Sequence, residues 1–345
     1  MVEIVIPARS SRAVTSRVRA LLITHLVFGS LCFAQSEGGA SDPSRFLAPS
    51  TVPRFALVVG VQNYWYLDHV PNAKNDATAI AQSLSNVGFS VTTLLDPTTN
   101  ELLQQVGQLK SRTGDLKKPV ITVLYFAGHG FQNGEWNWVV PVNADKDNPT
   151  AASIPVSSFI YDLANHAAGL AVFLFDSCRT GAPIGTEQQI AAASNVMHIA
   201  ASPTSPRAVV GLATLYGLPA DSSETEHDPN SPFSSELSQL IPQSGISLSD
   251  MFGEVQLNVL GRTQNKQAPE LVGGAVSTRF YFNPLDSQVK AARQNWEFIL
   301  RAPTAFCLNR YLNAYPDSPY LQSALEFRDS QLNQLETGGP MQCQP

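Results

Sequence analysis

The chain has 345 residues, of which 43% are hydrophobic and 14% are charged, and its formal net charge is -6. This length suits one large or two modest domains, and the composition is that of a globular protein with a buried core. The acidic balance and the lack of a long basic run argue against nucleic acid or an anionic membrane surface as a partner.

The N-terminal segment has the pattern of a secretory signal peptide. A mostly apolar run over residues 20–34 follows an arginine-rich stretch and is shorter than the roughly 20 residues that a membrane-spanning helix needs. Cys32 and Ala34 offer small residues for cleavage before Gln35. We therefore expect residues 1–34 to be a signal peptide, the protein to be secreted or periplasmic, and no stable membrane insertion after cleavage. An uncleaved anchor is one alternative, and a lipid anchor at Cys32 is another, although Leu31 stands where that signal needs a small residue.

The rest of the chain divides into predicted elements. Residues 35–52 are rich in Ser, Gly, Pro and Ala and are predicted to be a linker. Apolar periodicity predicts strands over residues 55–61, 89–95, 120–127, 170–175, 195–201 and 278–282, and a short extra strand or hairpin over residues 135–142. It predicts helices over residues 75–87, 101–111, 156–168 and 247–260. Residues 202–232 lack periodicity and contain many Pro, Ser, Asp and Glu residues, so we expect a long loop there.

Strands that alternate with helices predict an α/β fold, a three-layer sandwich with a mostly parallel central sheet flanked by helices. We expect this domain to occupy residues 53–285. Residues 286–345 are predicted to form a helical C-terminal segment, which is either an interaction module or a cap that packs on the domain.

Signal cleavage would leave three cysteines, and an odd number in an oxidising compartment predicts one disulfide and one free thiol. Cys307 and Cys343 both lie in the C-terminal segment and are the natural pair. The alternative is that these two and Cys178 are all free.

A histidine and a cysteine, which could act as base and nucleophile, follow two strands that are predicted to be neighbours. In parallel sheets, functional residues gather beyond the carboxyl ends of the strands, and His129 and Cys178 stand at two such ends. Cysteine attack on an acyl carbon needs a thiol, an imidazole base and backbone N–H donors for the oxyanion. Gly130 and Cys178 would supply those N–H groups. Taken singly, a cysteine after an apolar strand is more often a core residue, but the pair favours catalysis.

The segments Tyr125–Gly130 and Phe173–Gly181 resemble the catalytic motifs of the caspase/metacaspase superfamily. Cys178 follows His129 by 49 residues, close to the roughly 50 of that family. The resemblance covers about residues 53–283 and implies a caspase-like fold and a cysteine endopeptidase, with His129 as general base and Cys178 as nucleophile.

The same resemblance implies an acidic pocket that selects Arg or Lys before the cleaved bond. Asp176 and Asp76 match the two pocket acids, and paired carboxylates would hold a guanidinium through charge-assisted hydrogen bonds. The alternative for Asp76 is a helix-start residue favoured by the helix dipole. Two residues depart from the family pattern: Ala127 stands where metacaspases commonly have Ser, and Ala73 stands where some have Cys, so the pocket is expected to be weakened or reshaped.

A protease specific for basic residues would also be expected to cut itself in an exposed loop. Arg207 is the foremost candidate for this autocleavage, and Arg179 is the second. No acidic cluster or His/Cys spacing predicts a metal site; no cofactor is indicated and calcium dependence stays open, as does the oligomeric state.

Two other functions remain to be weighed. A catalytically silent caspase-fold scaffold that binds a partner is the main alternative to a peptidase acting on peptide or protein substrates. A nucleotide-binding domain is disfavoured, because no Gly-rich phosphate loop follows the first strand.

Overall fold

The computed structural model describes residues 46–47, 49–133, 136–164, 169–178, 207–214, 220, 229–273, 280–331, 335, 337–339 and 343. The predicted signal peptide lies outside these residues. None of the helices in the described ranges is both long enough and apolar enough to span a membrane.

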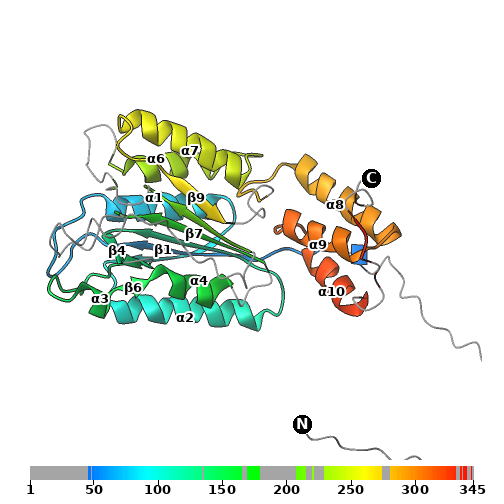
Figure 1. The fold of residues 1–345 in the computed structure, drawn as a ribbon, viewed down its shortest axis with the longest axis horizontal. Helices are drawn as coiled ribbons and strands as arrows, with labels where there is room; N and C mark the ends of the chain where they lie inside the picture. Colours follow the sequence, from blue (N-terminus) through cyan, green and yellow to red (C-terminus); the bar gives the residue numbers. More distant parts are fainter. Residues whose placement is uncertain are drawn as a thin grey trace, which may run out of the picture. The chain divides into compact units, whose positions relative to one another are not determined.

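A six-stranded sheet forms the centre of the domain, in the order β2-β1-β3-β7-β8-β9 (Figure 1). All neighbouring strands are parallel except the antiparallel pair β8 and β9. The strands β3 and β7 are buried at every position, as expected for strands rich in aliphatic and aromatic residues and covered on both faces. The strand bounds are β1 Arg54–Gly60, β2 Ser90–Leu95, β3 Ile121–Ala127, β7 Leu170–Asp176, β8 Ala208–Leu212 and β9 Glu270–Gly273.

Helices cover both faces of this sheet and complete the three layers (Figure 1). On one face, Ala56 and Val58 of β1 join the core formed with α1, α6 and α7, while on the other face Phe55, Leu57 and Val59 join the core formed with α2 and α4. This alternation follows from the two-residue period of a strand. The helix bounds are α1 Ala73–Asn86, α2 Thr99–Asp115, α4 Val156–Ala164, α6 Pro232–Leu240 and α7 Leu248–Arg262.

A small antiparallel sheet follows β3 and contains β4 (Gly130–Asn133), β5 (Trp136–Val139) and β6 (Ile154–Pro155). The four-residue helix α3 (Pro149–Ala152) precedes β6. Since β4 begins one residue after His129, the hairpin sets the direction in which the chain leaves the central sheet.

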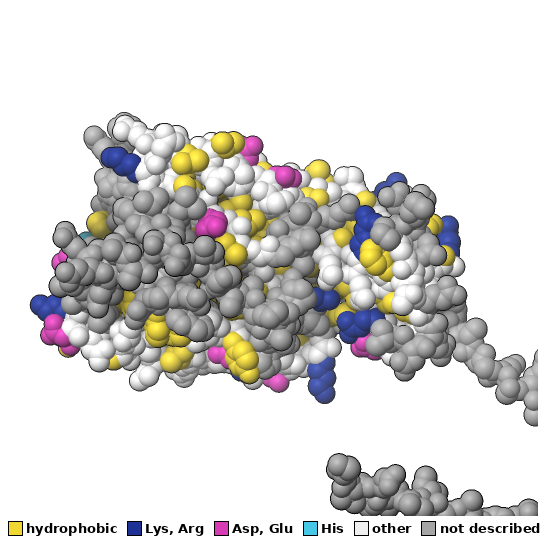
Figure 2. Space-filling view, viewed as in Figure 1, with side chains coloured by type: hydrophobic (Ala, Val, Ile, Leu, Met, Phe, Trp, Pro, Cys, Tyr) yellow, Lys and Arg dark blue, Asp and Glu magenta, His cyan; other side chains and the backbone are white. Residues whose placement is uncertain are grey.

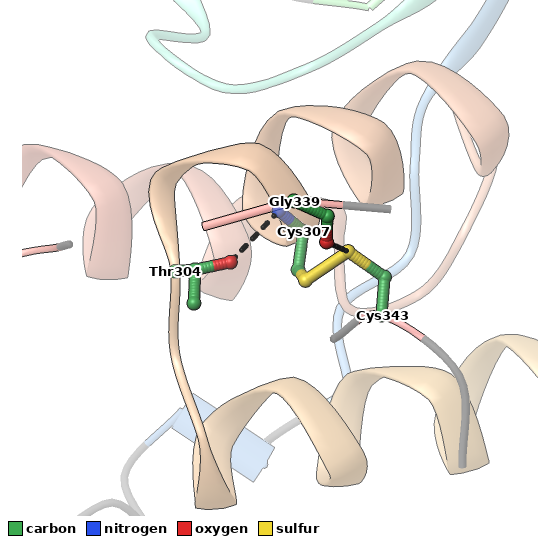
Figure 3. Close-up of a disulfide and its surroundings, with 4 residues drawn as sticks. All are labelled: Thr304, Cys307, Gly339 and Cys343. Carbon is green, nitrogen blue, oxygen red and sulfur yellow. Dashed lines mark hydrogen bonds between the residues drawn. A yellow bond between two sulfur atoms is a disulfide. The ribbon is translucent and has the colours of Figure 1, made fainter. Parts of the chain in front are cut away.

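The C-terminal segment is a helical module with its own core. It contains α8 (Asp286–Arg301), α9 (Ala305–Ala314) and α10 (Leu321–Gln331), and Trp296 is fully buried within it. A disulfide joins Cys307 on α9 to Cys343, the pair expected from the sequence, and ties the segment around Cys343 to that helix (Figure 3).

The module also includes residues that precede the domain. Phe46 is 3% exposed and packs edge-on against Phe327, and the Trp296 Nε1–H donates to the Phe46 carbonyl oxygen at 2.8 Å. The Ser50 N–H donates to the carbonyl oxygen of Pro319 at 2.7 Å. The later part of the segment predicted as a linker is therefore packed structure, because its one large aromatic side chain fills the module's core.

On the face shown in Figure 2, the acidic and basic side chains of the described residues are interspersed. Hydrophobic side chains on that face occur in separate small groups. The described residues drawn in Figure 2 therefore show no extended patch of a single charge.

Most predicted elements agree with the observed ones within a few residues, but three regions differ. The predicted loop over residues 202–232 contains the strand β8 and runs to the start of α6. The predicted strand over residues 278–282 has its first two residues outside the described ranges. Phe280 and Phe282 are buried core residues that join no strand, and only an isolated bridge forms at Asn283. The predicted strand over residues 195–201 lies outside the described residues.

Candidate active site

The sheet register places the two candidate catalytic residues side by side. Ala127 at the end of β3 pairs with Asp176 at the end of β7. His129 and Cys178 each lie two residues beyond these partners, and the Gly128 N–H donates to the Asp176 carbonyl oxygen at 3.2 Å. The two strand ends are thus held together where both side chains leave the sheet.

Gly130 allows the closest approach of these two strand ends. A Cβ atom at this position would lie 2.6 Å from Ser177 Oγ and 3.0 Å from the Cys178 carbonyl oxygen. Only glycine leaves room for the cysteine-bearing turn at that distance. The two residues predicted to supply oxyanion donors, Gly130 and Cys178, are therefore neighbours in space.

His129 is held by the loop between β1 and α1. The Tyr64 hydroxyl accepts the His129 backbone N–H at 2.7 Å, and the two rings pack at a centroid distance of 4.7 Å. The His129 Nε2 atom lies 2.8 Å from the Asp68 carbonyl oxygen. Since a carbonyl can only accept, Nε2 carries the proton, and in the neutral imidazole Nδ1 is left with the lone pair.

Burial lowers the pKa of His129, against the opposing effect of the Asp68 carbonyl. The neutral imidazole is therefore favoured near neutral pH. A neutral ring with its Nε2 proton fixed by a carbonyl is suited to accept a proton at Nδ1.

Cys178 is a partly buried free thiol. Its Sγ accepts the Ala220 N–H at 3.4 Å and lies 3.7 Å from the Ala220 carbonyl oxygen. Burial raises the pKa of Cys178, the Ala220 N–H lowers it, and the charge of Asp176 raises it. The resting thiol is thus protonated at neutral pH and needs a base to become a nucleophile.

Asp176 is 6% exposed and is surrounded by hydroxyl groups. Its Oδ2 atom accepts hydrogen bonds from Ser231 Oγ at 2.5 Å, Ser234 Oγ at 2.8 Å and the Tyr125 hydroxyl at 3.3 Å. Burial raises the pKa of Asp176, whereas these three donors lower it. The donors stabilise the charge that burial disfavours.

Asp76 lies in the first turn of α1 and is 2% exposed. Its Oδ1 atom accepts the backbone N–H of Ser231 at 2.8 Å. One residue, Ser231 at the start of α6, therefore contacts both predicted pocket acids, through its backbone and its hydroxyl. The structure brings Asp76 and Asp176 together, although no sequence signal links either to Ser231.

A cavity at this edge of the sheet is lined by both acids together with His129 and Cys178. Ala73 and Ala127 also line it. The two departures from the metacaspase pattern therefore widen the space beside the carboxylates. The described residues that line the cavity include no Lys or Arg, so its charge is acidic.

The structure places Arg207 differently from the expectation of an exposed loop. Arg207 is half-buried, and its carbonyl oxygen accepts the Ala171 N–H at 2.9 Å. The following residue, Ala208, is 1% exposed and begins β8. The expected exposure is wrong because the chain enters the central sheet here, and cleavage after Arg207 would require this strand to leave it. Arg179 lies outside the described residues.

Sequence reasoning assigned no role to four residues that support the site. Tyr64, Tyr125 and the neighbouring pair Ser231 and Ser234 lie in segments far apart in the sequence, and no spacing pattern links these segments. The one usable signal was Ser231 followed by Pro232, a typical helix start that the prediction assigned to the end of a loop. Among the described residues, no group of three or more His, Cys, Asp or Glu side chains could hold a metal ion.

The three-layer fold, with a histidine and a cysteine at the carboxyl edge of its sheet, defines a caspase-like protein. A family model described as the caspase domain matches residues 53–281, and the chain therefore belongs to the caspase-domain family of peptidases. The resemblance found in the sequence is thereby confirmed at the level of the superfamily.

Two relatives have recognisable sequence similarity. The mucosa-associated lymphoid tissue lymphoma translocation protein 1 of Homo sapiens and its Mus musculus homolog are each 30% identical over 131 residues, or 38% of this chain. The match spans only 16% of the human and 15% of the mouse protein.

Two solved structures share the fold. Caspase-1 from Spodoptera frugiperda superposes with a TM-score of 0.50 at 11% identity, covering 69% of this chain and 94% of that one. A protein from Geobacter sulfurreducens superposes with a TM-score of 0.50 at 14% identity, covering 68% of this chain and 100% of that one. At these identities the likeness concerns the fold alone.

Proposed function

We propose that this protein is an exported cysteine endopeptidase that cleaves after Arg or Lys. The observation that carries the proposal is the pairing of Ala127 with Asp176, which puts His129 and Cys178 at matching positions on adjacent strands. The family match supports a cysteine peptidase, and the two carboxylates in the same cavity support a basic specificity.

The chemistry follows from the protonation states of the two residues. Nδ1 of His129 takes the Cys178 proton as the sulfur attacks the peptide carbonyl carbon, and the carbonyl electrons move to the oxygen. The N–H groups of Gly130 and Cys178 would stabilise that oxyanion. Collapse to a thioester breaks the peptide bond, and the imidazolium returns the proton to the leaving amine. Water then hydrolyses the thioester with His129 as base.

Specificity for Arg or Lys would come from Asp76 and Asp176. A guanidinium or ammonium that enters the cavity would meet two carboxylates whose positions are fixed by the contacts of Ser231. Such preorganised acceptors bind a cation more strongly than flexible surface acids do. The alanine side chains at positions 73 and 127 leave room for the long aliphatic stem.

Export is proposed from the signal-like pattern of residues 1–34. The Cys307–Cys343 disulfide supports it, because structural disulfides persist mainly in oxidising compartments. A secreted or periplasmic location follows.

A binding scaffold remains a second candidate because of the contact between Cys178 and Ala220. Both main-chain polar groups of Ala220 contact the sulfur, and the thiol is partly buried. A protein that kept this contact permanently would bind partners without turnover.

Hydrolysis of fluorogenic peptides that end in Arg, Lys or Asp separates these functions. We expect the purified protein, assayed with and without calcium, to cleave after Arg or Lys, and Cys178→Ala to be inactive. Asp176→Asn should lose cleavage after basic residues, while Asp162→Asn, an acid on the surface helix α4, should retain it. Cleavage after Asp alone would refute the pocket assignment. A folded protein with a free thiol and no activity under any condition would favour the scaffold.

A further inference from the structure

The loop between β1 and α1 exposes two adjacent large aromatic side chains. Trp65 is 60% exposed and Tyr66 is 59% exposed. Their rings meet edge to face with centroids 6.4 Å apart. Burying such a pair against another apolar group would remove a large area from water.

This loop is held firmly on its inner side. Asp96 accepts the backbone N–H groups of Gln62 and Asn63 at 2.7 and 3.1 Å and pairs with Lys74 at 2.5 Å. The Trp65 N–H donates to the Val142 carbonyl oxygen at 3.1 Å. Main-chain anchoring fixes where the rings project, so binding would cost little further loop entropy.

The same loop borders the candidate active site. Tyr64, just before the aromatic pair, and Asp68, two residues after it, both hydrogen-bond to His129. His69, one residue further on, lines the cavity that contains Cys178. The exposed pair therefore belongs to a loop that holds His129 on one side and lines the cavity on the other.

We infer that Trp65 and Tyr66 form a subsite that binds an aromatic or aliphatic side chain of the peptide substrate, outside the residue before the cut. The inference rests on the proposed peptidase function. It adds a second determinant of specificity, apolar and on the bordering loop, to the acidic determinant inside the cavity. Rigid aromatic side chains serve this purpose well, because they offer a large contact area at a low cost in conformational entropy.

The test uses two dye-labelled peptides that share an Arg before the scissile bond. In one peptide the flanking residues are Trp and Leu, and in the other they are Gly and Ser. Binding is measured by fluorescence anisotropy on full-length Cys178→Ala protein, and kcat/KM is measured on the active protein. The variants are Trp65→Ser with Tyr66→Ser, beside Tyr161→Ser, which alters a 64% exposed tyrosine on α4.

We expect the apolar peptide to be preferred about tenfold in both Kd and kcat/KM. The double variant should lower this ratio to about 1, and Tyr161→Ser should leave it unchanged. A ratio near 1 in the parent protein, or a ratio that survives the double substitution, would overturn the inference. So would failure of Cys178→Ala to bind either peptide.

The two proposals fail in different ways. Selective binding of the apolar peptide without any turnover would refute the peptidase function and leave the binding surface established. Turnover of both peptides at equal rates would establish the peptidase function and refute the apolar subsite. If the parent protein forms dimers and the double variant does not, an unchanged peptide ratio would assign the aromatic pair to self-association and overturn the inference.

Discussion

Ser231 connects the stability of α6 to the charge of the specificity pocket, which makes Ser231→Ala an informative change. The Ser231 hydroxyl donates to Asp176 Oδ2 at 2.5 Å and accepts the Ser234 N–H at 3.0 Å as the helix N-cap. Its side chain is removed from solvent, with 1% exposed. Replacement by alanine removes both hydrogen bonds while keeping the backbone contact with Asp76.

The magnitude can be worked from these two bonds. Loss of an N-cap costs about 1 kcal/mol, and loss of a hydrogen bond to a charged group costs about 1.5–3 kcal/mol. We therefore expect the free energy of unfolding to fall by about 3 kcal/mol. The lost donor stabilised the ionised carboxylate, so the pKa of Asp176, which burial already raises, moves further upward. The acid limb of kcat/KM for Arg peptides should shift to higher pH.

Urea unfolding gives the first quantity, and a pH profile of kcat/KM on an Arg peptide gives the second. Ser238→Ala is the matched control, because Ser238 lies on the same helix and its hydroxyl bonds to the Ser235 carbonyl oxygen instead. An acid limb that stays in place, or moves to lower pH, would refute the assigned role of Ser231. A shift of equal size in Ser238→Ala would show that it arises from helix stability alone.

Three further changes test other parts of the structure. Gly130→Ala should reduce kcat/KM about 100-fold, because the new Cβ would press on Ser177 and displace the nucleophile turn. Burial raises the pKa of Asp317 from 3.8 to about 6. The carboxyl of Asp317 therefore loses its proton at a lower pH in the unfolded chain than in the folded one. As a result, the free energy of unfolding falls as the pH rises from about 4 through about 6. Asp317→Asn should remove that dependence, which amounts to about 2.4 kcal/mol between pH 4 and 7. Cys343→Ser should destabilise the helical module by about 4 kcal/mol, because the disulfide to Cys307 closes a loop with a sequence separation of 36.

Each change has a control and an outcome that would contradict it. Gly107→Ala, where an added Cβ meets nothing within 4 Å, should retain activity, and equal losses in the two alanine variants would contradict the close-approach argument. For Asp317→Asn, the free energy of unfolding in urea is measured at several pH values, with Asp286→Asn at an exposed position as the control. If this free energy depends on pH in the same way in Asp317→Asn and in the parent protein, Asp317 is not the source of the dependence. If α9 resists protease equally well in Cys343→Ser and in the parent protein, the disulfide does not contribute to the stability of the module.

The parts of the fold that sequence could predict are those whose residues carry a strong local pattern. The strands β3 and β7 are apolar apart from Thr122 and the final Asp176, and their ends therefore located His129 and Cys178. The strand β8 was missed because it is five residues long, lies among Pro- and Ser-rich segments, and contains Gly211. A Cβ at Gly211 would collide with the ring of Phe252 on α7. Tertiary packing thus requires a glycine where local propensity disfavours a strand.

The supporting residues of the site escaped prediction for a related reason. Ser231 and Ser234 contribute short hydroxyl side chains that are common in loops, and only the folded chain brings them to Asp176. Phe46 escaped in the same way, because a single aromatic residue in a polar stretch gives no periodic signal.

The closure of the helical module by Phe46 has a consequence for the order of folding. Phe46 and Trp296, which share a hydrogen bond, are 250 residues apart in sequence. Contacts between segments so distant carry a high loop-closure entropy and form late. The sheet can assemble from β1 onward as the chain emerges, whereas the module must wait for its helices and then recover a segment synthesised long before. Phe46, made early in synthesis, is thus among the last residues to reach its native contacts.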